Sequence, residues 1–385
     1  MKRLLPLVIA LLGTTALATP ALASPPKPVP QSTTSLTQQA TPPSPCAPTF
    51  QGATTDTRLT SLFTSYGNNN DRLDDWTGAD GTYSVKLPNG RELWVFSDTF
   101  LGQVNPDGSR PPVREEGGTT VFLNNSFAVE RNGRLQTIHD GTEQDPKAVM
   151  PPRDGTHWYW AGDATLAGGI VEVTYQEYER YGTGPWDWRW HRNVVARFAP
   201  GHLQSPISVH ELPSDHSVSW ASGIHRNATY TYVYGVEDLG SPKYMHIARV
   251  HGKSLLGAWE YLTKDGTWSS TETDSARVMD GVANEYSVSK VGNGYVLITH
   301  DTSEVLSPRI VMYTSCSPYG PFTGKTVVYT TPETGGNIFT YNAHAHPEIS
   351  GDRLVISYNV NSFVNTDHYR DVTIYRPRFL DLQFR

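Results

Sequence analysis

Short strand-forming runs recur along this chain at a nearly constant spacing, and this regularity constrains the fold more than any other feature. From about residue 78 onward, Gly, Asn, Asp and Pro separate short runs of aromatic and β-branched residues, a pattern typical of an all-β protein. The runs group into five units of roughly sixty residues, each with about four strands. The spacing predicts a five-bladed β-propeller, and a two-sheet sandwich, which needs fewer strands, is the weaker alternative.

Each predicted unit begins with an inner strand that would line the central channel of a propeller. These strands lie near residues 83, 157, 219, 285 and 344. Helical periodicity is scarce, and only residues 59–64 and 254–261 are compatible with short helices. Because no second linker interrupts this region, we expect residues 49–385 to form one β-propeller domain.

The N-terminal residues differ in composition from the rest of the chain. Residues 1–23 combine Lys2 and Arg3 with an apolar run and a small-residue motif ending at Ala23, which predicts a secretory signal peptide. Residues 24–48 are rich in Pro, Ser, Thr, Gln and Ala and are expected to form a disordered spacer. We therefore expect a secreted, extracellular protein. No apolar run is long enough to span a membrane.

The charge balance restricts the partners of the chain. The sequence has 31 Lys and Arg against 38 Asp and Glu, for a formal net charge of −7. Loss of Lys2 and Arg3 with the signal peptide changes this from −7 to −9. Because nucleic acids and anionic membranes attract positive proteins, neither is expected as a partner. We expect a monomer.

The chain has two cysteines, Cys46 at the end of the spacer and Cys316. In an exported protein, two cysteines most simply form one disulfide bond. Such a bond would attach the start of the domain to a distant part of the chain. Two free thiols are the alternative.

Residues 78–100 read as one β-hairpin. Its arms, residues 82–87 and 92–99, flank Pro88-Asn89-Gly90, and Asn-Gly is a preferred two-residue hairpin loop. This loop predicts that Val85 lies opposite Trp94. In the second arm, Trp94, Phe96 and Asp98 would share one face, and the residues between them would share the other.

The same hairpin would bring Asp80 and Asp98 together at its open end. A strand that buries Trp94 and Phe96 on one face has little reason to end that face in Asp. The two residues therefore suggest a pair of catalytic carboxylates, with Asp98 as the acid and Asp80 as the base or nucleophile. The structural alternative is that Asp98 starts a turn and Asp80 caps one.

Further polar residues occur at the ends of the predicted inner strands and are candidates for substrate binding. In the last unit, alternate residues from 342 to 348 are polar, so a regular strand would place them on one face. Buried histidines satisfied by hydrogen bonds are the alternative there, and a His-x-His metal site is weaker still. The substrate-binding candidates at these strand ends are Asp163, Asn284, Glu285, Asn342, His344 and His346.

Trp186, Trp188 and Trp190 alternate within a single run and would form a stripe on one strand face. Sugar rings stack on such surfaces, and packing between blades uses them equally well. We include Trp188 among the substrate-binding candidates. The sequence contains no GxSxG elbow, CxxC pair, HExxH helix or phosphate-binding glycine loop, so serine and zinc hydrolases have no support. No metal or cofactor is expected at the site, and the question of a structural ion in the central channel is left open.

Four segments of the chain have a distinctive wording. They are WTGADGTYSVKLPNGRELWVFSDTFLG at residues 76–102, VFLNNSF at 121–127, SPYGPF at 317–322 and NAHAHPEISGDRLVISYNVNS at 342–362. These segments resemble a group of exported bacterial proteins that were long grouped as domains of unknown function, some of which are now classed as glycoside hydrolase family 183, the endo-D-arabinanases. The resemblance covers most of residues 63–385.

The resemblance implies a five-bladed propeller that acts on arabinofuranosyl polymers of actinobacterial cell walls. The two catalytic aspartates of the family fall on Asp80 and Asp98. Ser97 stands where the family is expected to have Gly, and residues 114–119 differ from the family pattern. We therefore expect a secreted glycoside hydrolase with a polysaccharide substrate. A non-catalytic carbohydrate-binding propeller and a secreted cell-surface module are the alternatives.

Overall fold

The computed structural model describes residues 46–184 and 187–385. The predicted signal peptide, most of the predicted spacer and Trp186 lie outside the described residues. The described part is mostly β, and five of its sheets contain four or more antiparallel strands. No described helix is long and apolar enough to cross a membrane.

The first sheet has the order β3-β4-β7-β8, and a smaller sheet, β2-β5-β6, lies beside it. The strands β9 and β10 form a separate pair. The bounds in this region are β2 Trp76–Ala79, β3 Tyr83–Lys86, β4 Glu92–Phe96, β5 Thr99–Leu101, β6 Val121–Leu123, β7 Ser126–Arg131, β8 Arg134–Ile138, β9 Asp140–Gly141 and β10 Pro146–Lys147.

The second and third sheets follow in chain order. The second sheet is β11-β12-β13-β14, and the third is β15-β16-β17-β18-β19 with β20 paired to β17. Their bounds are β11 His157–Ala167, β12 Ile170–Arg180, β13 Trp188–Phe198, β14 Ser208–Glu211, β15 Val218–Arg226, β16 Tyr230–Asp238, β17 Lys243–His251, β18 Trp259–Leu262, β19 Trp268–Ser269 and β20 Met279–Asp280.

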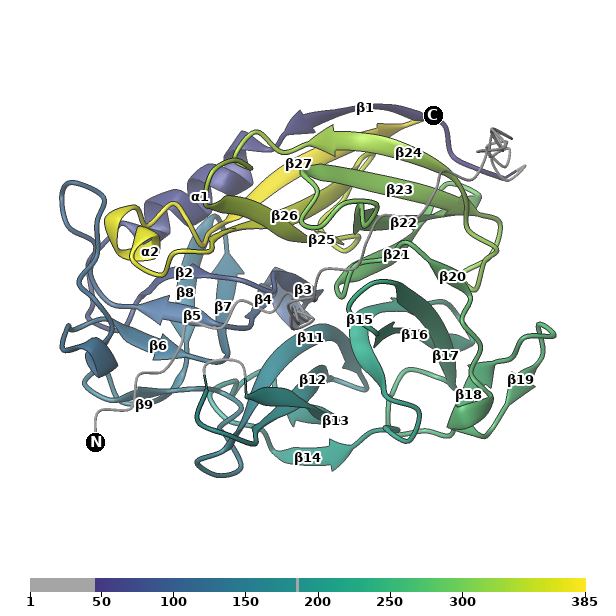
Figure 1. The fold of residues 1–385 in the computed structure, drawn as a ribbon, viewed down its shortest axis with the longest axis horizontal. Coiled ribbons are helices and arrows are strands. Elements are labelled where there is room, and N and C mark those ends of the chain that lie inside the picture. Colours follow the sequence, from purple (N-terminus) through teal and green to yellow (C-terminus); the bar gives the residue numbers. More distant parts are fainter. Residues whose placement is uncertain (1–45, 185–186) are drawn as a thin grey trace, which may run out of the picture.

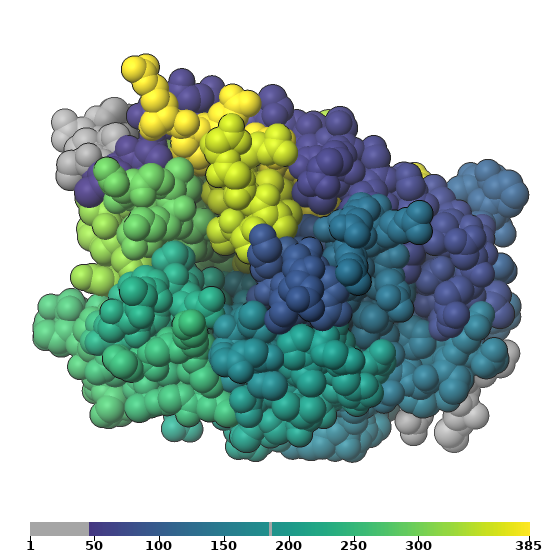
Figure 2. Space-filling view, turned by 180° about the vertical axis from the view of Figure 1, so that it is seen from behind, coloured from purple at the N-terminus to yellow at the C-terminus, as the bar shows by residue number. Residues whose placement is uncertain are grey.

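The fourth sheet is β21-β22-β23-β24, and the fifth, β1-β27-β26-β25, combines strands from both ends of the described chain. Figure 1 shows β1 running beside β27, and Figure 2 shows the segments near the two ends lying together. The bounds are β1 Phe50–Thr55, β21 Tyr286–Val291, β22 Gly294–His300, β23 Arg309–Ser315, β24 Thr323–Thr330, β25 Ile338–Ala345, β26 Leu354–Ser362 and β27 Pro377–Phe384.

The innermost strands of the five sheets, which are edge strands of each sheet, surround a common centre (Figure 1). Each of β3, β11, β15, β21 and β25 contacts the next strand in this order. The ring contact between Tyr83 of β3 and His344 of β25, with centroids 4.8 Å apart, closes the circle. This arrangement is consistent with a β-propeller.

The helices are few and short. The helix α1 (Thr57–Gly67) is capped by Asp56, whose Oδ1 accepts the N–H of Leu59 at 2.9 Å, so the predicted helix at residues 59–64 is confirmed. The helix predicted at residues 254–261 is wrong, because β18 begins within this segment. The other helical elements are α2 Asp367–Arg370 and the 3₁₀ turns Pro88–Gly90, Arg114–Glu116 and Glu272–Asp274.

The hairpin at residues 78–100 forms, but the predicted register is wrong by one residue. Ser84, rather than Val85, lies opposite Trp94. The reason is the loop, in which Pro88–Gly90 forms a 3₁₀ turn closed by a hydrogen bond from Leu87 N–H to Arg91 O at 2.9 Å. The loop is thus longer than the two-residue Asn-Gly turn that the sequence suggested.

The alternation of β4 is confirmed by its two separate cores. Trp94 and Phe96 pack with Phe63 of α1, whereas Leu93 and Val95 pack toward the second sheet. A strand buried on both faces in this way is held rigidly. The segment that follows it, which contains Asp98, is therefore placed by two cores at once.

Cys46 and Cys316 form a disulfide bond, as predicted. The bond joins the residues before β1 to the residue directly after β23. It therefore ties the fifth sheet, to which β1 belongs, to the fourth.

Candidate active site

Asp80 and Asp98 are brought together by strand pairing. Asp80 directly follows β2 and Asp98 directly precedes β5, and the adjacent residues Ala79 and Thr99 are paired. The N–H of Asp80 donates to the carbonyl oxygen of Asp98 at 3.1 Å, and the N–H of Ser97 donates to the carbonyl oxygen of Asp80 at 2.9 Å. The two aspartates therefore lie opposite each other.

Gly81 permits this close approach. Its φ is +62°, and a Cβ added there would lie 2.8 Å from Ser97 Oγ. Both conditions favour glycine, because other residues rarely adopt this backbone conformation. The turn beside Asp80 therefore depends on a residue without a side chain.

Both carboxyl groups line an open pocket with an empty volume of about 450 Å³, part of which is open solvent. The lining combines carboxyl, amide and aromatic groups from four of the five sheets or their ends. The lining residues are Asp80, Ser97, Asp98, Trp160, Gln176, Tyr178, Asn284, Glu285, Tyr341 and Asn342.

Asp98 is almost completely buried, with 2% of its surface exposed. Its Oδ1 accepts hydrogen bonds from Trp160 Nε1 at 2.8 Å and from Asn124 Nδ2 at 3.0 Å. Burial, reinforced by the nearby charge of Asp80, raises the pKa of Asp98 well above its ordinary value, and the two hydrogen bonds oppose this only in part. The two donors meet one oxygen, so the other oxygen is left to carry the proton.

Asp80 is also buried, but a hydroxyl donor stabilises its charged form. Tyr341 Oη donates to Asp80 Oδ2 at 2.5 Å. Burial raises the pKa of Asp80 to about 6, and the hydrogen bond from Tyr341 limits this rise. The pKa of Asp98 is therefore raised more strongly than that of Asp80, so Asp98 is the member of the pair that holds its proton more tightly.

Glu285 supplies a third carboxyl group to the pocket. Burial raises the pKa of Glu285 well above its ordinary value, and the charge of Asp80 adds to this effect. Asp80, Asp98 and Glu285 therefore form one electrostatically connected group.

Three buried side-chain oxygens of the pocket lack a well-formed hydrogen bond among the described residues: Asp80 Oδ1, Glu285 Oε2 and Asn284 Oδ1. The hydroxyls of Tyr375 and Tyr83 lie close enough to Asp80 and Glu285, respectively, to lower the pKa values of these carboxyl groups. Buried acceptors normally have a donor. The pocket is therefore suited to a ligand that presents several hydroxyl groups.

Asn284, Glu285 and Asn342, three of the predicted binding residues, line the pocket with the two aspartates, whereas Asp163, His344 and His346 do not. The expectation that residues 342–348 share one face is wrong. The strand β25 has an irregular register between Tyr341 and His344, and Asn342 has a φ of +56°. This bulge turns Tyr341 and Asn342 into the pocket together.

The buried Asp163 connects the second sheet to the third. Its Oδ1 accepts the N–H of Ala164 at 2.7 Å, and its Oδ2 accepts the N–H of Ile224 in β15 at 2.6 Å. Burial raises the pKa of Asp163 to about 8. His344 Nε2 lies 3.8 Å from the same Oδ2, and burial lowers the pKa of His344 to about 3.

His346 is held by side-chain hydroxyls. Its Nδ1 lies 2.5 Å from Ser84 Oγ, and its Nε2 lies 2.8 Å from Ser357 Oγ. Its ring centroid is 5.1 Å from that of Trp94. These contacts match the alternative of a buried, satisfied histidine.

A model of the family described as Domain of unknown function (DUF5005) matches residues 61–383. The chain belongs to the DUF5005 family. No curated protein matches the sequence. The DUF5005 region includes the whole pocket lining.

Solved structures similar to this DUF5005 protein include one from Bacteroides ovatus ATCC 8483, described as a candidate hydrolase. The TM-score is 0.70 at 22% identity over 86% of this chain and 90% of that chain, so the two share a fold. For a GH43_1 enzyme from Xanthomonas citri, the TM-score is 0.46 at 13% sequence identity, over 80% of this chain and 88% of that chain. For exo-β-1,3-galactanase from Phanerochaete chrysosporium, the TM-score is 0.47 at 12% sequence identity, over 80% of this chain and 63% of that chain. The last two scores are too low to carry an argument.

Trp188 is not among the residues that line the pocket of this DUF5005 protein. Its ring packs edge-on against Trp160 and Tyr178, with centroids 5.5 Å and 5.4 Å apart. Both of these neighbours line the pocket. Trp188 thus packs behind the aromatic wall, as the packing alternative suggested.

Sequence reasoning missed several functional candidates of the DUF5005 pocket. They share no spacing with the aspartates, because strand pairing and the curvature of neighbouring sheets bring them in. The available signals were weak: Trp160 belongs to a predicted inner strand, and Tyr341 precedes Asn342. The missed residues are Asn124, Trp160, Gln176, Tyr178 and Tyr341.

Proposed function

We propose that this DUF5005 protein is a glycoside hydrolase in which Asp80 and Asp98 are the catalytic pair. The observation that carries the proposal is the pairing of two buried carboxyl groups in one pocket, with pKa values raised to different extents. Glycosidic bond cleavage requires one protonated and one ionised carboxyl group. The pocket oxygens that lack a well-formed hydrogen bond can accept from hydroxyl groups, which supports a sugar as the ligand.

The electrostatics support a role for each aspartate. Asp98, whose pKa is raised more strongly, is the general acid that protonates the leaving oxygen. Asp80, ionised above about pH 6 and held by Tyr341, is the base that activates water or the nucleophile that attacks the sugar carbon.

Other pocket residues would bind the sugar. Asn284, Glu285 and Asn342 are placed to hydrogen-bond its hydroxyls, and Trp160 and Tyr178 offer aromatic surface. Trp188 would act by supporting these two rings. We assign to Asp163, His344 and His346 the role of holding the inner strands in place.

The proposed substrate is a furanosyl polysaccharide, the D-arabinan of actinobacterial cell walls. The support is the resemblance of residues 76–102 and 342–362 to glycoside hydrolase family 183.

We also infer that the five large sheets are the blades of a five-bladed β-propeller formed by residues 49–385. The disulfide between Cys46 and Cys316 supports the proposed secretion.

The deciding experiment is incubation of the purified protein with arabinogalactan and related polymers, followed by analysis of the released sugars. We expect oligosaccharide release from an arabinofuranosyl polymer. Binding of a polymer without cleavage would instead favour the carbohydrate-binding alternative. Cleavage of a different glycan would retain the catalytic pair and reject the arabinan.

A further inference from the structure

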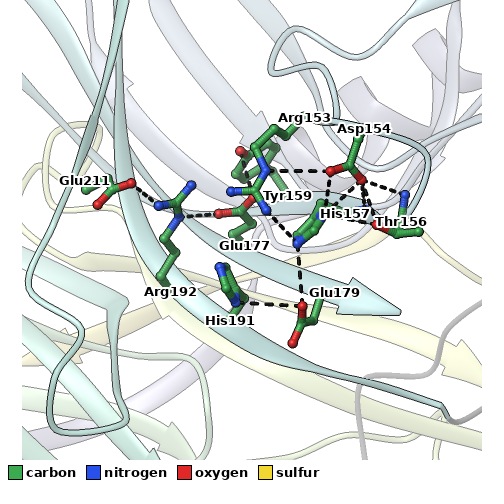
Figure 3. A network of polar contacts seen from close by, with 10 residues as sticks. All are labelled: Arg153, Asp154, Thr156, His157, Tyr159, Glu177, Glu179, His191, Arg192 and Glu211. Carbon is green, nitrogen blue, oxygen red and sulfur yellow. Dashed lines mark hydrogen bonds and ion pairs between the residues drawn. The ribbon is translucent and has the colours of Figure 1, made fainter. Parts of the chain in front are cut away.

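A group of side chains that can act as metal ligands lies on the second sheet, outside the residues that line the pocket. The ligand atoms of His157, Glu179 and His191 all lie within 4.8 Å of one another (Figure 3). Among residues 46–184 and 187–385, this is the one set of three or more His, Cys, Asp or Glu residues whose ligand atoms are so close.

Strand pairing explains how three strands contribute to this group. His157 at the start of β11 is directly paired with Glu179 of β12, so their side chains share a face. In β13, Trp190 pairs with Tyr178 and Arg192 pairs with Glu177, which leaves His191 as the extra residue of a β-bulge. A bulge re-aims the side chain of its extra residue, and here His191 points toward Glu179.

The distances suit a single metal ion after small side-chain movements. Glu179 Oε2 lies 3.6 Å from His157 Nε2 and 3.9 Å from His191 Nδ1. Ligand atoms that share one tetrahedral zinc ion at about 2.0–2.1 Å are separated by roughly 3.3 Å. His191 is exposed and the other two are half-buried, so rotation of side chains can close the difference.

A neighbouring carboxylate fixes the tautomer of His157. Its Nδ1 lies 2.8 Å and 2.9 Å from the two oxygens of Asp154. Because a carboxylate accepts a hydrogen bond, Nδ1 carries the proton and Nε2 carries the lone pair. This carboxylate–histidine arrangement is the usual support of a metal-bound imidazole.

Two arginines border the group. Arg189 Nε donates to Glu179 Oε1 at 2.6 Å, which leaves Oε2 for the histidine side. Arg153 Nη2 lies 2.7 Å from His157 Nε2, and a guanidinium is only a donor, so it occupies the lone pair that a metal would use. Because 40% of the Arg153 side chain is exposed, it can move away.

We propose that His157, Glu179 and His191 bind a divalent transition metal ion of the zinc class, with water completing the coordination. Two imidazoles and one carboxylate suit zinc, whereas calcium and magnesium require mainly oxygen ligands. The ion would join β11, β12 and β13 at the ends that carry Trp160, Tyr178 and Trp188. It would therefore stabilise the sheet that forms the aromatic side of the pocket.

The test is calorimetric titration of protein without a polyhistidine tag with zinc chloride near neutral pH, together with melting temperatures measured with and without zinc. We expect saturable binding and a higher melting temperature in the wild type, with both effects lost in Glu179→Gln and His191→Ala. Asp154→Asn should weaken binding by about 10–100-fold, because the imidazole loses its orienting partner. Arg153→Ala should bind zinc more tightly.

His210→Ala is the matched control, because His210 is an exposed histidine on β14 of the same sheet. It should bind zinc like the wild type, and calcium should produce no shift in any variant. Circular dichroism establishes that each variant is folded. The proposal is overturned if the wild type shows no zinc binding, if Glu179→Gln and His191→Ala both retain it, or if Arg153→Ala weakens it.

Discussion

The N–H of Asp80 donates a hydrogen bond to the carbonyl oxygen of Asp98 at 3.1 Å. This contact, together with the pairing of Ala79 with Thr99, makes neighbours of two carboxylates that are well separated in sequence, and it does so through the backbone. Their side chains can therefore be changed without losing the bond that positions them. Mutations at these two positions should report chemistry rather than folding.

Asp80→Asn and Asp98→Asn should each abolish glycan cleavage while leaving the fold intact. Asn keeps the shape of Asp but supplies neither a carboxylic proton nor a carboxylate, and general acid–base catalysis alone is worth roughly 10²–10⁴ in rate. Stability in urea should be unchanged or higher, because a buried carboxyl group that is costly to ionise is replaced by a neutral amide. Product analysis and circular dichroism check the two parts. Full activity in the double mutant would falsify the catalytic pair.

The pH–rate profile should have an acid limb near pH 6, because burial raises the pKa of Asp80 to about 6 and its ionised form is the active one. Activity should fall again at higher pH as Asp98 loses its proton. Tyr341→Phe removes the hydroxyl that favours the ionised form of Asp80, so the acid limb should move to higher pH. An acid limb that stays in place would argue against Asp80 as the group that titrates.

Glu285→Gln and His346→Ala should have different effects, although sequence reasoning grouped these residues. Glu285 lines the pocket, so Gln should raise KM by roughly 5–10-fold, the worth of about one hydrogen bond. His346 is enclosed by Ser84 and Ser357, so Ala should lower the unfolding free energy and leave KM nearly unchanged. Steady-state kinetics and urea unfolding of both variants separate the two effects.

Asp163→Ala should destabilise the protein by about 1–3 kcal/mol at acid pH, because two buried N–H groups lose their acceptor. The folded pKa of Asp163, about 8, lies above its ordinary value. Its stabilising contribution is therefore full below its unfolded pKa and is lost as pH rises through about 8. The cost of the mutation should shrink at alkaline pH in urea unfolding. Asp145→Ala, an exposed control, should change little at any pH.

Replacing both Cys46 and Cys316 with Ser should lower the unfolding free energy by about 5 kcal/mol in the chain-entropy model of a long closed loop. The bond holds the segment before β1 against the fourth sheet, so the fifth sheet should become protease-sensitive first. Limited proteolysis with mass spectrometry locates the cleavage. Equal stability with and without the bond would show that β1 is held by its pairing with β27 alone.

The sequence alone predicted the features that local patterns encode. Alternation in residues 92–99 gave the two faces of β4, and the recurrence of strand runs gave five large sheets. It also brought Asp80 and Asp98 together, even though the predicted register was wrong by one residue. That error was harmless because either register leaves both residues at the open end of the hairpin.

The pocket itself was decided by tertiary structure. Trp160, Glu285 and Tyr341 reach Asp80 and Asp98 from different sheets, and no local pattern encodes which inner strands become neighbours. The bulge at Asn342 breaks the two-residue period, so His344 and His346 leave the face that the spacing gave them. Sequence determines strands and their faces through local sterics and burial. The packing of whole sheets around a centre decides which polar groups share a pocket, and burial there sets their pKa values.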